Sequence, residues 1–137
     1  MISVDTNILI YAANPSSVRH DKALGFMRSH GNLEIALCEL VLIELYMALR
    51  NPAIFSKPYT ASQAADYCMR LKTNPNWCYI DYEPEVSIEL WKWAKLTKRG
   101  YRQMIDARIA LTLKHHGVTQ FATANTKDFS DFGFIRL

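Results

Sequence analysis

Ile2-Ser3-Val4-Asp5-Thr6-Asn7-Ile8-Leu9 is the stretch that says most about the architecture of this chain. Ile2–Val4 is a short apolar run that predicts a first strand, and residues 7–13 predict a short helix after it. Ligands of parallel sheets gather just beyond the carboxyl ends of the strands. Asp5 stands directly after the predicted strand and is therefore a first candidate for function.

The rest of the chain alternates in the same way. Further strands are predicted at residues 34–38, 77–80, 118–123 and, as a short last strand, 134–137. Further helices are predicted at residues 16–30, 40–50, 60–73, 84–100 and 102–116. Strands separated by helices favour an α/β fold, in which a parallel sheet is covered by helices on both faces.

The composition is that of an ordinary globular protein. The 137 residues, 50% of them hydrophobic and 21% charged, suit a single domain spanning residues 1–137. The longest apolar-rich run, residues 40–49, is interrupted by Glu44, and the N-terminus has no basic region, so we expect no membrane span, no signal peptide and a cytoplasmic location. Three cysteines without C-x-x-C spacing predict free thiols.

Positive charge is concentrated in one window of the sequence. Residues 91–116 contain seven Lys and Arg residues and one acid, Asp106, although the whole chain has a formal net charge of only +3. A positive stretch around a single carboxylate indicates a polyanionic partner near that carboxylate. A solvated helix face explains the charge equally well.

Four acids are distinguished by their neighbours: Asp5 at a strand end, Glu44 and Asp106 in apolar helices, and Asp128 after the fourth strand. Taken singly, Asp5 is explained as a helix cap, Asp106 as a complement to a helix dipole and Asp128 as a turn residue. Glu44 is harder to explain, because a charge among Leu and Ile residues is costly unless it is paired or bound to a metal.

Taken together, the four acids predict a divalent-metal site. Carboxylates that converge at one edge of a sheet repel one another, and a hard cation relieves that repulsion. Mg²⁺ prefers oxygen ligands, typically one or two carboxylates with water and substrate phosphates, and Mn²⁺ accepts similar ligands. Such an ion activates water for attack on a phosphodiester.

The motifs resemble those of the PIN domain, most closely of VapC-type toxins. Asp5-Thr6-Asn7, Glu44 in its apolar helix, Asp106 and the segment Thr123-Ala124-Asn125-Thr126-Lys127-Asp128 occur in the family's order over nearly the whole chain. The resemblance implies a three-layer PIN fold whose parallel sheet has about five strands in the order 3-2-1-4-5. It also implies a Mg²⁺- or Mn²⁺-dependent endoribonuclease of a toxin–antitoxin system.

The resemblance also implies roles for individual residues. Asp5, Glu44 and Asp106 match the family's first three acids, and Asp5 and Asp106 are expected to hold the metal. The fourth motif has Asn at position 125, so Asp128 is the expected fourth acid. Thr6, Thr123 and Asn125 are expected to support these acids. The residues expected to contact RNA phosphates lie beside the acids in sequence and are Lys98, Arg99, Arg102, Arg108 and Lys127. A VapB-type antitoxin and a homodimer are implied by the family alone.

Two other functions are compatible with parts of the pattern. A phosphatase of the haloacid dehalogenase type also begins with an Asp at a strand end, but that family has a second Asp two residues later, where this chain has Asn7. The other possibility is a PIN fold that has lost most of its catalysis and binds RNA or a protein. The presence of all four acids argues against it.

Overall fold

The structure is a computed structural model that describes residues 1–136. Its five strands are β1 (Ile2–Val4), β2 (Ile35–Cys38), β3 (Trp77–Ile80), β4 (Gln120–Ala122) and β5 (Ile135–Arg136). Its helices are α1 (Thr6–Ala13), α2 (His20–His30), α3 (Glu39–Leu49), α4 (Ala61–Lys72), α5 (Pro84–Leu96), α6 (Met104–His115) and α7 (Thr126–Phe129). Short 3-10 turns lie at Tyr101–Gln103 and Ser130–Phe132.

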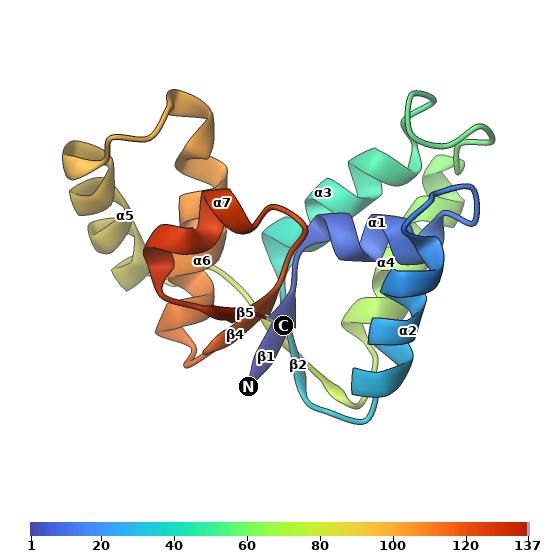
Figure 1. The fold of residues 1–137 in the computed structure, drawn as a ribbon, viewed down its shortest axis with the longest axis horizontal. Coiled ribbons are helices and arrows are strands. Elements are labelled where there is room, and N and C mark those ends of the chain that lie inside the picture. Colours follow the sequence, from blue (N-terminus) through green and yellow to red (C-terminus); the bar gives the residue numbers. More distant parts are fainter. Residues whose placement is uncertain (137) are drawn as a thin grey trace.

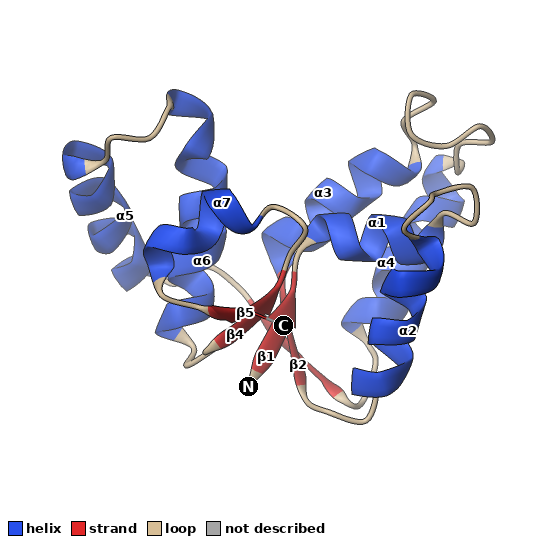
Figure 2. Ribbon diagram, viewed as in Figure 1, coloured by secondary structure: helices blue, strands red, loops and turns tan. Residues whose placement is uncertain are grey.

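The strands form one parallel sheet in the order β3-β2-β1-β4-β5. Helices α1 to α4 lie on one side of the sheet, and α5 to α7 lie on the other (Figures 1 and 2). The α/β architecture and the order predicted from the sequence are confirmed, although β5 is only two residues long and β3-β2-β1-β4 form the body of the sheet. Residue 137, included in the predicted last strand, lies outside the described residues.

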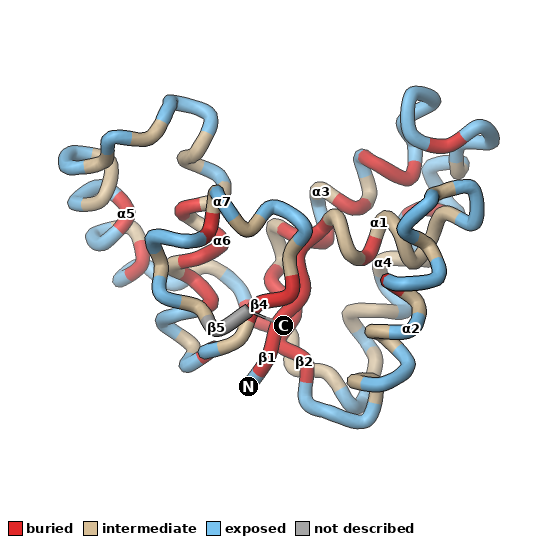
Figure 3. The backbone as a smooth tube through the Cα atoms, viewed as in Figure 1, coloured by how far each residue is buried: buried red, intermediate tan, exposed pale blue. Residues whose placement is uncertain are grey.

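The sheet is buried because it is covered on both faces. All residues of β1 and β2 are buried, as expected for central parallel strands (Figure 3). Their side chains pack with the apolar faces of the flanking helices, where Leu45 of α3 and Leu113 of α6 are fully buried. The carboxyl ends of β1 and β4 consequently lie at fixed positions next to each other, in the register Val4↔Ala122.

Local sequence explains where several helices begin and end. Thr60 caps α4 through a capping box with Gln63, as predicted. Pro84 occupies the first turn of α5, and Gly117, with φ +80°, follows α6 in the left-handed conformation that favours glycine. No helix within residues 1–136 is long and apolar enough to cross a bilayer. Cys38, Cys68 and Cys78 are all free thiols, as predicted.

Three elements differ most from the bounds predicted from the sequence. Helix α2 begins at His20 rather than at residue 16, because the side chains of Asn14 and Ser17 accept backbone N–H groups and hold the preceding residues in turns. Helix α5 ends at Leu96 rather than at residue 100, and Thr97 Oγ1 accepts the backbone N–H of Arg99 in the loop that follows. Strand β4 has three residues, not six.

Candidate active site

Asp5 lies at the junction of β1 and α1, directly beside the end of β4. Its backbone N–H donates to the carbonyl of Ala122 at 2.8 Å, which extends the pairing of the two strands by one residue. Its Oδ1 accepts the backbone N–H of Thr6 at 2.7 Å and so caps α1. The capping role that explained Asp5 from sequence is therefore real, and it also fixes where the carboxylate points.

The other oxygen of Asp5 is held by two side chains. Oδ2 accepts from Thr123 Oγ1 at 2.6 Å and from Asn7 Nδ2 at 3.1 Å. Burial raises the pKa of Asp5, and this outweighs the hydrogen bonds, which lower it; the charge of Asp128 raises it further. Asp5 is thus a nearly inaccessible carboxylate, 6% exposed, whose orientation is set by three donors.

Glu44 approaches Asp5 from α3. Thr6 Oγ1 donates to Glu44 Oε2 at 3.3 Å, so Thr6 contacts one acid through its backbone and another through its side chain. The pKa of Glu44 is raised, first by burial and then by the negative charge of Asp5. The position of Glu44 in this cluster explains why a charged residue occurs in an apolar helix.

Asp106 lies in the first turn of α6, on the opposite side of the sheet from Glu44. Its pKa is raised to about 6, first by burial and then by the charges of Asp5, Asp128 and Glu44, in that order. The other three acids therefore all act on the carboxyl group of Asp106. The side chains that the sequence singled out are brought together at one edge of the sheet, although they are spread over more than a hundred residues of chain.

Asp128 is carried by α7, a four-residue helix that the sequence did not predict. Asn125 Nδ2 donates to its carboxylate, and the backbone N–H of Asn125 donates to Thr123 Oγ1 at 2.9 Å. The supporting residues Thr123 and Asn125 thus connect Asp5 with Asp128. Asp128 is a helix residue rather than the turn residue that was its alternative explanation.

Among the described residues, no cationic side chain forms an ion pair with the four acids of the cluster. The ion pairs found within residues 1–136 are Lys92–Glu89, Arg99–Asp131 and His116–Glu83, and none includes a member of the cluster. Repelling oxygen donors of this kind suit a divalent cation. In the described part of the chain, no group of three or more His, Cys, Asp or Glu side chains is arranged to hold a metal ion by itself. Carboxylate oxygens are nevertheless the type of ligand that a hard divalent cation prefers.

The basic residues expected near RNA differ in how free their charges are. Lys98, Arg102 and Lys127 are exposed. Arg108 is partly buried, and its guanidinium lies 4.1 Å from the centroid of the Tyr82 ring. The positive window of the sequence is therefore only partly available to a polyanion.

Arg99 in particular is occupied within the protein. Its Nε donates to Asp131 Oδ2 at 2.8 Å, and its Nη2 donates to the Lys127 carbonyl at 2.8 Å and to Ser130 Oγ at 3.1 Å. These contacts join the loop after α5 to both ends of the segment that carries Asp128. Arg99 is placed to hold α7 more directly than to hold a phosphate.

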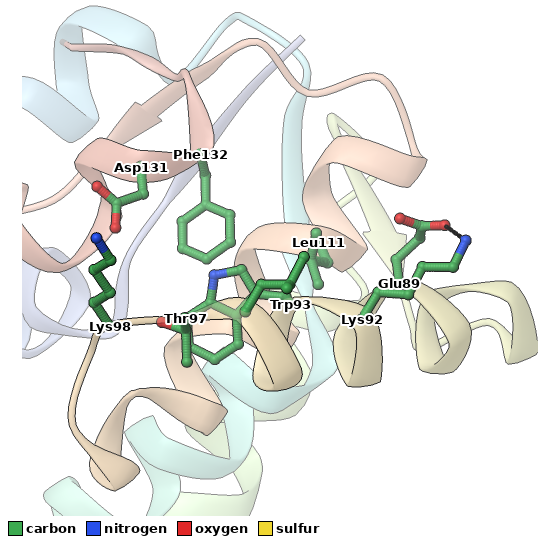
Figure 4. A pocket seen from close by; sticks show the side chains of 9 residues that line it. Glu89, Lys92, Trp93, Thr97, Lys98, Leu111, Asp131 and Phe132 are labelled. Atoms are coloured by element: carbon green, nitrogen blue, oxygen red, sulfur yellow. Dashed lines mark ion pairs between the residues drawn. The ribbon is translucent and has the colours of Figure 1, made fainter.

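A pocket between α5, α6 and the 3-10 turn after α7 lies apart from the acids. Trp93 and Phe132 stack at its centre with ring centroids 5.9 Å apart, and Lys98 points toward Asp131 at its rim (Figure 4). None of the four acids lines it. Its aromatic stack packs α5 against the C-terminal segment.

Asn7 is a residue of the cluster that the sequence did not identify. Its Nδ2 donates to Asp5, and its Oδ1 accepts the backbone N–H of Ala124 at 3.1 Å. From the sequence, Asn7 was noted as part of the Asp5-Thr6-Asn7 motif and as a position where a phosphatase would have Asp, but no role was predicted for it. An amide directly after Asp5-Thr6 was the available signal, since Asn offers both a donor and an acceptor.

Comparisons with known proteins agree with this architecture. The family model of the PIN domain matches residues 2–135. Ribonuclease VapC24 of Mycobacterium tuberculosis (strain H37Rv) is 44% identical over 138 residues, covering 100% of this chain and 94% of that protein.

Solved structures are similar over nearly the whole chain. The crystal structure of VapC20 of M. tuberculosis, a toxin that cleaves the sarcin–ricin loop, superposes with a TM-score of 0.77 at 19% identity, covering 98% of this chain and 97% of that one. A toxin–antitoxin complex from Klebsiella pneumoniae superposes with a TM-score of 0.68 at 20% identity, covering 98% and 96%. At these sequence identities, the two solved structures show that the fold is shared and nothing more.

Proposed function

The chain belongs to the PIN domain family, and from this we propose that it is a VapC-type toxin, a metal-dependent endoribonuclease that hydrolyses RNA phosphodiester bonds. The observation that carries the proposal is the cluster of Asp5, Glu44, Asp106 and Asp128, in which burial and neighbouring negative charges raise the pKa values of Asp5, Glu44 and Asp106 and no ion pair within residues 1–136 includes a member. The identity of 44% to a ribonuclease over the full chain supports it. The whole chain acts as one PIN domain in this proposal.

Asp5 and Asp106 are the residues that would hold Mg²⁺ or Mn²⁺. When bound, the ion would lower the pKa of water and neutralise charge on the phosphate. Thr6, Asn7 and Thr123 keep the Asp5 carboxylate in one orientation, so it needs no rearrangement to serve as a ligand.

Glu44 and Asp128 would position the attacking water and accept its proton. Burial and the charge of Asp5 raise the pKa of Glu44, which makes it a stronger base than an ordinary Glu. Attack on phosphorus would break the bond to the 3′ oxygen. The products would carry a 5′-phosphate and a 3′-hydroxyl, and the 3′ oxygen takes up a proton from solvent.

The test is the substitution Asp5→Asn. It keeps the size of the side chain but removes its charge, so we expect cleavage of RNA to fall by at least about 100-fold, more than the loss typical of a residue that only supports a metal ligand. Binding of Mn²⁺ in a titration should weaken in parallel. Asp66→Asn, an exposed acid on α4, is the matched control and should leave both unchanged.

Each outcome separates the proposal from its alternatives. An Asp5→Asn protein that folds and keeps wild-type, metal-dependent cleavage would refute it. Intact RNA affinity without Mn²⁺ binding in the wild type would favour a non-catalytic binding module. Turnover of small phosphomonoesters without RNA cleavage would favour a phosphatase, against which Asn7 already argues because it donates to Asp5.

We include an antitoxin, a homodimer and a cytoplasmic location in the proposal. The Klebsiella structure is a toxin–antitoxin complex, and the chain exposes large apolar side chains on α3 to α5: Ile43, Met47, Met69, Ile88 and Trp91. The free thiols fit a reducing compartment. Co-purification with the product of an adjacent small reading frame, light scattering and cell fractionation test these points. Failure to capture that product would contradict the antitoxin. A monomeric mass would contradict the homodimer, and secretion would contradict the cytoplasmic location.

A further inference from the structure

A cavity of about 390 Å³ lies beside the carboxylate cluster, between α1, α2 and the segment after β4. Its lining includes Tyr11 of α1, Arg19 and Lys22 at the start of α2, and Thr123. This is the size range of a small-ligand site. Neither Arg19 nor Lys22 belongs to the positive window of residues 91–116.

The cavity adjoins the candidate active site through Thr123. Thr123 lines the cavity and also donates to Asp5 Oδ2 at 2.6 Å. Ala124 lines it too, and its backbone N–H is bound by Asn7. A ligand in the cavity therefore contacts the residues that orient Asp5, and one chain of substrate can reach both places.

The rim of the cavity is cationic and aromatic. Arg19 and Lys22 are exposed and take part in none of the ion pairs found within residues 1–136. The Arg19 guanidinium lies 5.4 Å from the centroid of the Tyr11 ring, and its Nη1 donates to Tyr11 Oη at 3.5 Å. Two positive charges at this rim would hold a phosphate at a distance from the acids, which repel phosphate unless a cation intervenes.

The apolar part of the cavity suits a base. Ile8 and Phe26 contribute to the lining, and Phe26 is only partly buried. Bases extruded from single strands pack on aromatic rings and on Arg guanidinium planes. The Arg19–Tyr11 pair offers one surface of each kind.

We propose that this cavity binds the nucleotide next to the scissile phosphodiester of a single-stranded RNA. Arg19 and Lys22 bind its phosphate, and the base packs against the Arg19–Tyr11 pair and the apolar lining. The proposal rests on the proposed ribonuclease function. In this arrangement the bound RNA runs from the four acids toward α2.

The test measures binding of a short single-stranded RNA to protein carrying Asp5→Asn, which prevents cleavage during the titration. Combining it with Arg19→Ala and Lys22→Ala should raise Kd by about tenfold and reduce the slope of log Kd against log salt concentration by about 1 to 2, one for each lost phosphate contact. In protein with Asp5 intact, the same two substitutions should raise KM and leave kcat within about twofold.

The chain contains a matched control for the cation–aromatic pair. Arg50 lies 5.7 Å from the Tyr46 ring centroid and donates to Tyr46 Oη at 3.2 Å, the same arrangement on another helix. Arg50→Ala should leave RNA binding unchanged. Arg19→Lys with Lys22→Arg keeps the charges and should restore most of the affinity, which excludes misfolding as the cause of the loss.

Unchanged Kd and salt slope in the Arg19→Ala, Lys22→Ala protein would overturn the proposal. A loss as large in Arg50→Ala would also overturn it, because the effect would then be general electrostatics. If the pair of substitutions abolished capture of a co-expressed protein and left RNA binding intact, the cavity would belong to a protein partner. The binding assay decides this even if the chain cleaves no RNA, so the two proposals fail separately.

Discussion

The two acids assigned to the metal are held in opposite ways. Asp5 accepts hydrogen bonds from Thr6, Asn7 and Thr123, and it is almost completely buried. Asp106 is half-buried, and only burial and the charges of the other acids act on its pKa. In the proposed metal site, the hydrogen bonds to Asp5 are therefore complete without an ion, and an ion would be needed to stabilise the charge of Asp106.

The most severe test of this contrast is Asp106→Asn. If the ion is what mainly stabilises the charge of Asp106, that charge is essential to activity and lowers the stability of the metal-free protein. We expect cleavage to fall by at least about 100-fold, because a ligand is lost. At the same time we expect Tm of the metal-free protein to rise at pH 8, since the repulsion from Asp5, Asp128 and Glu44 is removed.

The pH dependence of that rise follows from the pKa of Asp106. It is about 6 in the folded protein and 3.8 ordinarily, so the folded state binds the proton more tightly. The tighter binding of this proton stabilises the folded state below about pH 4, and this stabilisation is lost as the pH rises to about 6. The gain in Tm from Asp106→Asn, followed by circular dichroism in EDTA, should shrink between pH 8 and pH 5. An equal gain at both pH values would contradict the raised pKa, and Asp66→Asn serves as the control.

A smaller effect is expected on the Asp5 side, where support is shared among several donors. Thr123→Val removes the 2.6 Å hydrogen bond but leaves those from Thr6 and Asn7. Activity and Mn²⁺ affinity should fall by about tenfold, the range of an outer partner of a metal ligand. Thr123→Ser keeps the hydroxyl and should recover most of the loss. If Ser behaves like Val, the methyl group matters and the hydrogen bond does not.

The smallest effect is expected at Arg99, which acts on the cluster only through α7. Arg99→Ala frees the segment from Lys127 to Asp131 and should lower kcat by about two- to fivefold, as exposed ion pairs are weak. The substrate KM should change less than kcat. Lys95→Ala removes an exposed charge on α5 and is the control. If Lys95→Ala instead has the larger effect on kcat, the holding role assigned to Arg99 is wrong.

The acids could be predicted from the sequence because the rule that identifies them is topological. Parallel strands end at one edge of the sheet, so residues directly after β1 and β4 must lie close together wherever they stand in the chain. Asp5 follows β1, and Thr123 follows β4. Glu44 was visible as a charge in an apolar helix, which the chemistry of burial makes unusual.

The cations could not be predicted in the same way. A run of Lys and Arg reports charge per length of chain, and it says nothing about which side chains already have partners. Arg99 is bound to Asp131, and Arg108 lies over Tyr82. Arg19 and Lys22 stood in a stretch of ordinary charge, and only the packing of α1 against α2 brings them to the cavity that Thr123 also lines. Helix α7, with four residues, is too short for a periodic pattern to reveal.

The hydrogen bond between Thr123 and Asp5 joins residues 118 positions apart. During synthesis, the first strand leaves the ribosome long before Thr123 has been added. The part of the Asp5 support that comes from Thr123 is therefore among the last features of the molecule to form, after most of the sheet has been translated. The proposed active site is thus incomplete on the nascent chain until synthesis is nearly finished.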